Sequence, residues 1–147
     1  MKKLDVRAVR NGKEWREVKS IRTKVFIEEQ ECEPRQEWDE YETSSRQMIG
    51  LLGGKPVATA RWRTVWHEER RVAKLERFAV LKEYRGKGYG RSLVEQVMTD
   101  ARMAGRRDFL IHAQQHLEDF YRSFGFETVG EPFEEAGIPH VKMVRLA

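Results

Sequence analysis

A length of 147 residues suits one compact domain, and a composition of 39% apolar and 35% charged residues excludes a disordered chain. The net charge of +4, from 28 basic and 24 acidic residues, leans only weakly toward anionic ligands. The longest apolar run, 78–81, is too short to span a bilayer, no signal-peptide stretch follows the N-terminal Met-Lys-Lys, and a single cysteine excludes an internal disulfide. These features predict a cytoplasmic protein.

The first third of the chain predicts a strand, a helix and an irregular segment. Alternating apolar residues over 4–8 favour a strand, which Asn11-Gly12 ends. Apolar residues recur every three or four positions over 13–29, which indicates an amphipathic helix. The polar, proline-containing segment 32–45 is typical of a loop or a short irregular helix.

The remainder predicts an antiparallel meander followed by alternating helices and strands. The meander strands cover 47–52, 55–66 and 71–81, and the later helices and strands cover 91–104, 109–113, 118–124, 126–133 and 140–146. This order predicts an α+β fold with one βαβ crossover. We expect a single domain, residues 1–147, with a mixed, mostly antiparallel sheet of about seven strands and about four helices.

The segment Arg85-Gly86-Lys87-Gly88-Tyr89-Gly90 lies between a predicted strand and a predicted helix. Alternate glycines allow backbone N–H groups to converge and phosphate oxygens to approach, and a helix N-terminus adds a positive dipole end. The spacing matches neither the dinucleotide-binding fingerprint nor a P-loop. The pattern predicts a pyrophosphate site, with an ordinary glycine-rich turn as the alternative.

This loop resembles the signature of the GNAT family of N-acetyltransferases, Arg/Gln-x-x-Gly-x-Gly/Ala, through Arg85, Gly88 and Gly90. Segments 22–30, 60–63, 120–126 and 134–143 extend the resemblance to a small bacterial-type branch of undefined substrate. The resemblance implies a GNAT-like α/β fold that binds acetyl-CoA, with its pyrophosphate on the loop and its pantetheine on the preceding strand. The implied binding residues are Phe78, Ala79, Val80, Arg85, Gly86, Lys87, Gly88, Tyr89, Gly90 and Arg91.

Acetyl transfer to an amine needs a proton acceptor for the amine and a proton donor for the leaving thiolate. Tyr121 matches the family tyrosine often given the donor role, and a place in the aromatic core is the alternative. By strand alternation Glu76 is expected to share a face with Phe78 and Val80 and to act as the base through water. A solvated or salt-bridged carboxylate is the alternative.

Two more residues complete the predicted catalytic set. Gln114, with His112, ends the strand after the crossover and is placed to orient water or substrate, and we expect His140 to point into the same cleft. No metal site is predicted, because His112 and His116 are four residues apart with no helix evident. Direct transfer needs no acyl-enzyme nucleophile, so Cys32 is interpreted as incidental.

Eight acidic residues between positions 28 and 42 suggest an acidic acceptor wall suited to a cationic amine, or simply a solvated surface. The residues expected there are Glu28, Glu29, Glu37, Asp39 and Glu40. The predicted function is direct transfer of acetyl from acetyl-CoA to a primary amine of a small molecule or peptide.

Other functions and partners stay open at this point. A different acyl donor is one alternative, because the first-helix segment also resembles acyl-homoserine lactone synthases, and a non-catalytic CoA sensor is another. Scattered basic residues disfavour nucleic acid, and no membrane partner is expected. An edge strand near 61–66 leaves a homodimer open.

Overall fold

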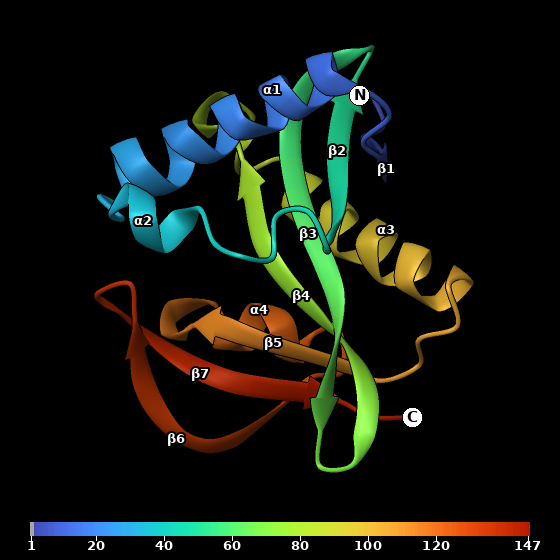
Figure 1. The fold of residues 1–147 in the computed structure, drawn as a ribbon, viewed down its shortest axis with the longest axis vertical. Coiled ribbons are helices and arrows are strands. Elements are labelled where there is room, and N and C mark those ends of the chain that lie inside the picture. Colours follow the sequence, from blue (N-terminus) through green and yellow to red (C-terminus); the bar gives the residue numbers. More distant parts are fainter. Residues whose placement is uncertain (1) are drawn as a thin grey trace.

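A computed structural model describes residues 2–147, which form one seven-stranded sheet in the order β1-β2-β3-β4-β5-β7-β6 (Figure 1). Every neighbouring pair is antiparallel except β4 and β5, which the crossover helix α3 joins in parallel. The strands are β1 (Asp5–Ala8), β2 (Arg46–Leu52), β3 (Lys55–His67), β4 (Arg70–Val80), β5 (Phe109–Gln114), β6 (Glu127–Glu135) and β7 (Ile138–Arg145). The helices are α1 (Gly12–Arg22), α2 (Pro34–Glu37), α3 (Tyr89–Met103) and α4 (Glu118–Arg122). The predicted α+β fold is confirmed.

Helix α1 begins at Asn11, whose side chain accepts a hydrogen bond from the Glu14 N–H at 2.9 Å. The helix continues directly into a π-helical segment, Thr23–Glu29, so the residues of the predicted helix 13–29 are helical throughout. Its buried residues Ile21 and Val25 pack against Ala79 and Leu81 of the chain around the end of β4.

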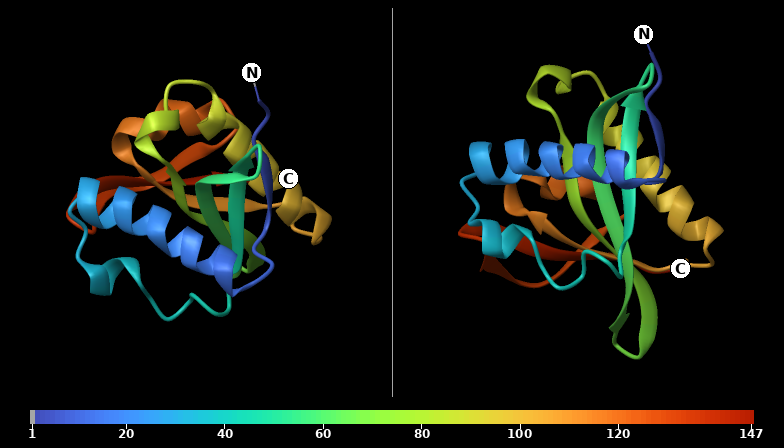
Figure 2. Two further views of the ribbon diagram at one scale, coloured as in Figure 1. Left: turned by 90° about the horizontal axis from the view of Figure 1, so that it is seen from above. Right: turned by 45° about the horizontal axis from the view of Figure 1, so that its top comes forward.

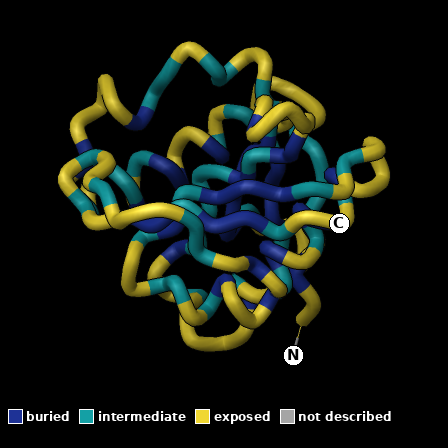
Figure 3. The backbone as a smooth tube through the Cα atoms, turned by 90° about the horizontal axis from the view of Figure 1, so that it is seen from below, coloured by how far each residue is buried: buried dark blue, intermediate teal, exposed yellow. Residues whose placement is uncertain are grey.

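Helices cover both faces of the sheet, as the view from above shows (Figure 2). On one face lie α1 and α2, and on the other α3 packs against β3, β4 and β1 while α4 packs against β5. The central strands are the most deeply buried part of the chain, with exposed loops at the rim (Figure 3). None of the helices formed by residues 2–147 is long and apolar enough to cross a membrane.

The parallel pair β4–β5 stays together for only three residue pairs, from Ala73↔Phe109 to Leu75↔Ile111. Just beyond, β4 carries a bulge: two residues, Arg77 and Phe78, lie opposite one residue of β3. Arg77 takes a left-handed backbone conformation with φ of 59°. The bulge therefore coincides with the point at which β4 and β5 part.

The predicted edge strand near 61–66 is an edge only in part. Residues up to Trp62 of β3 pair with β2, and only the segment beyond Trp62 has β4 as its single strand neighbour. Trp66 lies on this segment and is 68% exposed. A homodimer through this segment stays a prediction.

Candidate active site

A cleft of about 650 Å³ opens where β4 and β5 separate. One wall is Leu75–Val80 of β4 and the other is Ile111–Gln114 of β5, with α1, the segment around α2 and the β6–β7 turn closing the rim. All four predicted catalytic residues line this cleft, namely Glu76, Tyr121, Gln114 and His140. The fold thus gathers side chains that are up to 64 positions apart in the sequence.

The bulge corrects the predicted orientation of Glu76. Leu75 lies in the same apolar cluster as Phe78 and Val80, on the α3 face, whereas Glu76 lies among charged residues on the opposite face. Simple alternation would put Glu76, Phe78 and Val80 together, and that prediction is wrong because Arg77 occupies an additional position in the strand.

Glu76 is a salt-bridged carboxylate. Its Oε1 accepts hydrogen bonds from Nε of Arg63 at 2.8 Å and Nε of Arg61 at 3.2 Å, and its Oε2 lies 3.6 Å from Nζ of Lys74. Burial raises the pKa of Glu76, but the three cations outweigh burial and hold the pKa below its usual value. A carboxylate so stabilised is a weaker proton acceptor.

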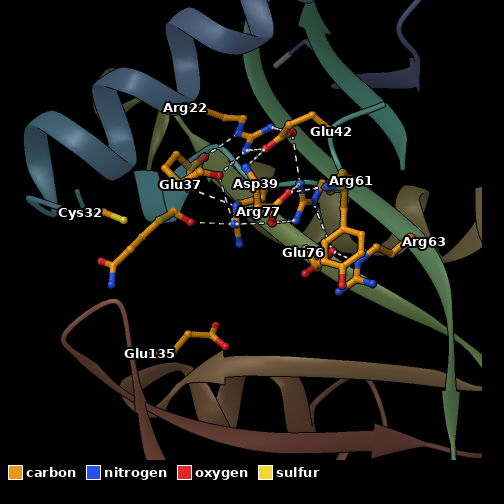
Figure 4. Close-up of polar contacts among 12 residues, drawn as sticks. Arg22, Cys32, Glu37, Asp39, Glu42, Arg61, Arg63, Glu76, Arg77 and Glu135 are labelled. Atoms are coloured by element: carbon orange, nitrogen blue, oxygen red, sulfur yellow. Dashed lines mark hydrogen bonds and ion pairs between the residues drawn. The ribbon is translucent and has the colours of Figure 1, made fainter. Parts of the chain in front are cut away.

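A buried ionic network extends from Glu76 toward α1 and α2 (Figure 4). Arg61, fully buried, binds Asp39 through both Nη atoms at 2.8 and 2.6 Å. Arg22, only 1% exposed, binds Glu37 at 2.6 Å and Glu42 at 2.7 Å. The acidic segment therefore supplies the counter-ions of these arginines.

This pairing corrects the predicted acidic acceptor wall. Glu37 and Asp39 do line the cleft, but Arg77 lies 3.1 Å from one and 3.2 Å from the other. Glu28 and Glu40 are exposed, and Glu29 binds Arg85 at 2.7 Å. The two members of this set that line the cleft, Glu37 and Asp39, are thus paired with arginines and do not present a free negative surface there.

The glycine loop, residues 85–90, has the geometry that its sequence predicts. Gly86 and Gly88 have φ values of 76° and 86°, and a Cβ at either would meet no atom of the protein within 4 Å. The N–H of Ser92 makes the first helical hydrogen bond, to the Gly88 oxygen, so the preceding N–H groups face outward from the first turn of α3. The open space beside these glycines is compatible with a phosphate group.

The basic residues of the loop have different surroundings. Arg85 donates from Nε to the Val80 oxygen at 2.8 Å as well as binding Glu29. Arg91 binds the Ser123 hydroxyl at 2.5 Å and stacks 4.5 Å from the ring of Phe124. Lys87 is exposed. All three cations are exposed, and two of them, Arg85 and Arg91, already have protein partners.

Tyr121 lies 4% exposed at the inner end of the cleft, within an aromatic cluster that includes Phe78, Phe120 and Phe126. Burial raises its pKa, so the hydroxyl keeps its proton at neutral pH. Tyr121 thus packs in the aromatic core and also borders the cleft, and its role as proton donor stays a prediction.

The opposite wall holds a histidine–carboxylate group that sequence reasoning missed in part. Glu135, at the end of β6, lies 3.1 Å from Nδ1 of His112 and 3.8 Å from Nε2 of His140. Figure 4 shows Glu135 pointing toward the arginine network from across the cleft. Gln114, beside them, donates to the Gln30 side chain at 3.0 Å. Within residues 2–147 no cluster of three or more acidic, His or Cys side chains is arranged to hold a metal ion.

Comparison with known proteins identifies the family. A family model described as the acetyltransferase (GNAT) domain matches residues 18–147. YjcF of Bacillus subtilis, described as an uncharacterized N-acetyltransferase, is 32% identical over 137 residues, covering 92% of this chain and 95% of YjcF. The chain therefore belongs to the GNAT acetyltransferases, as its glycine loop predicts.

Solved structures of the family share this fold. An acyl-CoA N-acyltransferase from Pseudomonas aeruginosa superposes with a TM-score of 0.84 at 27% identity, over 99% of both chains. A GNAT acetyltransferase from Elizabethkingia anophelis, solved with acetyl-CoA bound, superposes with a TM-score of 0.72 at 15% identity, over 98% of both chains. The predicted seven-stranded arrangement is thus that of known acyltransferases.

Proposed function

We propose that this protein transfers the acetyl group of acetyl-CoA directly to the primary amine of a small molecule or peptide. The observation that carries the proposal is the gap between β4 and β5 together with the glycine loop at its end. Backbone groups of β4 beyond the bulge lack a β5 partner and line the cleft, so they can bind the pantetheine arm. The loop and the first turn of α3 can bind the pyrophosphate.

Tyr121 is the proposed proton donor to the leaving thiolate. Its raised pKa keeps the proton available, and its ring is fixed by the surrounding phenylalanines. Gln114 borders the same cleft and is proposed to orient the acceptor or a water molecule, since its link to Gln30 fixes the amide.

We propose His140, in preference to Glu76, as the group that accepts the proton of the amine. Its Nδ1 lies 2.7 Å from the Ile138 carbonyl oxygen, which can only accept a hydrogen bond, so Nδ1 bears the proton and Nε2 the lone pair. Glu135 lies 3.8 Å from Nε2 and would stabilise the imidazolium formed on proton transfer. Glu76 stays a candidate, but it is already bound by two arginines.

The test is release of free CoA thiol from acetyl-CoA in the presence of a panel of amines, with calorimetric titration of CoA alongside. The proposal expects CoA binding and amine-dependent thiol release. CoA binding without thiol release for any amine would favour a sensor. Faster release from longer acyl-CoA thioesters would favour a different acyl donor.

A further inference from the structure

Two cations lie directly opposite each other on the acceptor side of the cleft. Arg63 of β3 and Lys74 of β4 are register partners, and both line the cleft. Their side chains are only 17% and 15% exposed. Like charges in directly opposed strand positions destabilise a sheet, and burial increases the cost. This arrangement therefore needs a compensating anion.

Glu76 compensates the Arg63–Lys74 pair only in part, because it is shared with Arg61. Arg63 uses Nε for its hydrogen bond, and within residues 2–147 neither of its Nη groups has a hydrogen-bond partner. The ammonium of Lys74 has no hydrogen bond there either, since its 3.6 Å separation from Glu76 is too long. Unused donors of both side chains thus remain at the cleft.

Within the part of the network on the α1 and α2 side of the cleft, cations exceed carboxylates by one, and Glu135 acts on Lys74 from the other side. This part contains five cations and four carboxylates: Arg22, Arg61, Arg63, Lys74 and Arg77 against Glu37, Asp39, Glu42 and Glu76. Burial raises the pKa of Glu37, and protonation of that group would only increase the excess. Because Glu135 supplies a fifth carboxylate, the unused donors of Arg63 and Lys74 are the observation that favours a bound anion.

The Arg63 guanidinium is fixed in an orientation that suits a bound anion. It stacks 3.7 Å from the ring of Tyr41 and is tied to Glu76 through Nε, which leaves the Nη edge as a fixed pair of donors. A planar guanidinium edge of this kind matches a carboxylate. Across the cleft, Glu135 offers a negative charge beside His140, so the two walls have opposite signs.

We propose that Arg63 and Lys74 bind a carboxylate of the acceptor, and that the acceptor is therefore an amino acid. The proposal rests on the acetyltransferase function proposed above. The amine lies toward His140 and Glu135 while the carboxylate lies on the Arg63–Lys74 pair. A polyamine would place a further cation beside Arg63 and Lys74 and would leave their donors unused, whereas a carboxylate accepts from both.

The test compares matched acceptors in the thiol-release assay. Each amino acid of a panel is paired with its carboxamide, and with the amine that lacks the carboxyl group. We expect kcat/KM for the preferred amino acid to exceed that for its amide by about 10-fold or more, as for one charge-assisted hydrogen-bonded pair. Lys74→Met should lower this acid-to-amide ratio by a similar factor, whereas Lys13→Met, at an exposed position, should leave the ratio unchanged.

Binding of product gives a second readout that does not depend on turnover. An N-acetyl amino acid should bind more tightly than its N-acetyl amide in calorimetry, and Lys74→Met should remove the difference. Equal use and equal binding of acids and amides, or a ratio that Lys74→Met leaves intact, would overturn the proposal. So would faster reaction of aminoalkyl phosphates than of amino acids. Absence of CoA binding would instead refute the proposed function. The binding of the N-acetyl amino acid, compared with that of its amide, would still test the carboxylate site.

Discussion

Arg61→Met is expected to destabilise the protein strongly. Arg61 is fully buried, binds Asp39 through two hydrogen bonds, and lies 3.1 Å from Glu42 and 3.2 Å from Glu76. Methionine fits the volume of the arginine stem but leaves three carboxylates without their shared cation.

The size of the effect follows from the chemistry of buried ion pairs. Removing one partner and leaving the other charged costs about 3–5 kcal/mol. In a domain of this length about 1 kcal/mol lowers the melting temperature by about 2–4 °C. We therefore expect a decrease of about 6–20 °C at pH 7, measured by thermal unfolding followed by circular dichroism.

The pH dependence of the difference in melting temperature tests whether lost charge pairing causes the destabilisation. Burial raises the pKa of Asp39, but the hydrogen bonds from Arg61 and the Tyr41 N–H more than offset it and lower the pKa from 3.8 to about 2. A carboxyl group with a lowered pKa in the folded state stabilises that state above pH 3.8 and loses its contribution as the pH falls toward 2. The gap between wild type and Arg61→Met should therefore be widest near neutral pH and narrow below pH 4.

The control is Arg107→Met, which removes an exposed arginine and should leave the melting temperature almost unchanged. A decrease of less than about 3 °C for Arg61→Met would show that the network contributes little to stability. A gap of constant size from pH 7 to pH 3 would indicate lost packing as the cause instead of lost charge pairing.

Three further predictions concern the cleft. Gly88→Val should weaken CoA binding at least 10-fold in calorimetry, because φ of 86° strains valine and its side chain would fill the phosphate space; unchanged affinity in a folded variant would contradict the loop assignment. Tyr121→Phe should lower kcat by about 10- to 100-fold without rescue at high pH, and a wild-type rate would remove the hydroxyl from the reaction. His140→Gln should lower kcat, with partial rescue at high pH where the amine loses its proton in solution, while Glu76→Gln should keep a rate near wild type; the reverse result would make Glu76 the base.

Local patterns were sufficient to predict the order of elements and the glycine loop. Apolar spacing marked the helix over 13–29, and the glycines marked a turn whose φ values only glycine adopts readily. These features depend on residues close together in the chain. The parallel crossover also followed, because two parallel strands need a long crossover connection, which is usually a helix.

The bulge and the ionic network were not predicted, because both depend on contacts between distant segments. A signal for the bulge was nevertheless present: Leu75 and Phe78 are three positions apart, where one face of a regular strand requires two. For the network, Arg61 lies fully buried where β3 has a strand on each side, so it needed carboxylate partners. Glu135 gave no local signal, since its partner His112 is 23 residues away.

One additional residue in β4 links the proposed cofactor side of the cleft to the proposed acceptor side. At the Arg77 bulge β4 leaves β5, which creates the proposed space for the thioester. The same displacement places Glu76 and Arg77 on the α1 and α2 face, where both join the buried network. The charge of the proposed acceptor wall is therefore set by residues that also take part in the buried network. We therefore expect most substitutions in this wall to change acceptor preference and stability together. Lys74 is the exception, because its ammonium lies at the edge of the network and makes no hydrogen bond within residues 2–147. A substitution there should change acceptor preference with little effect on stability.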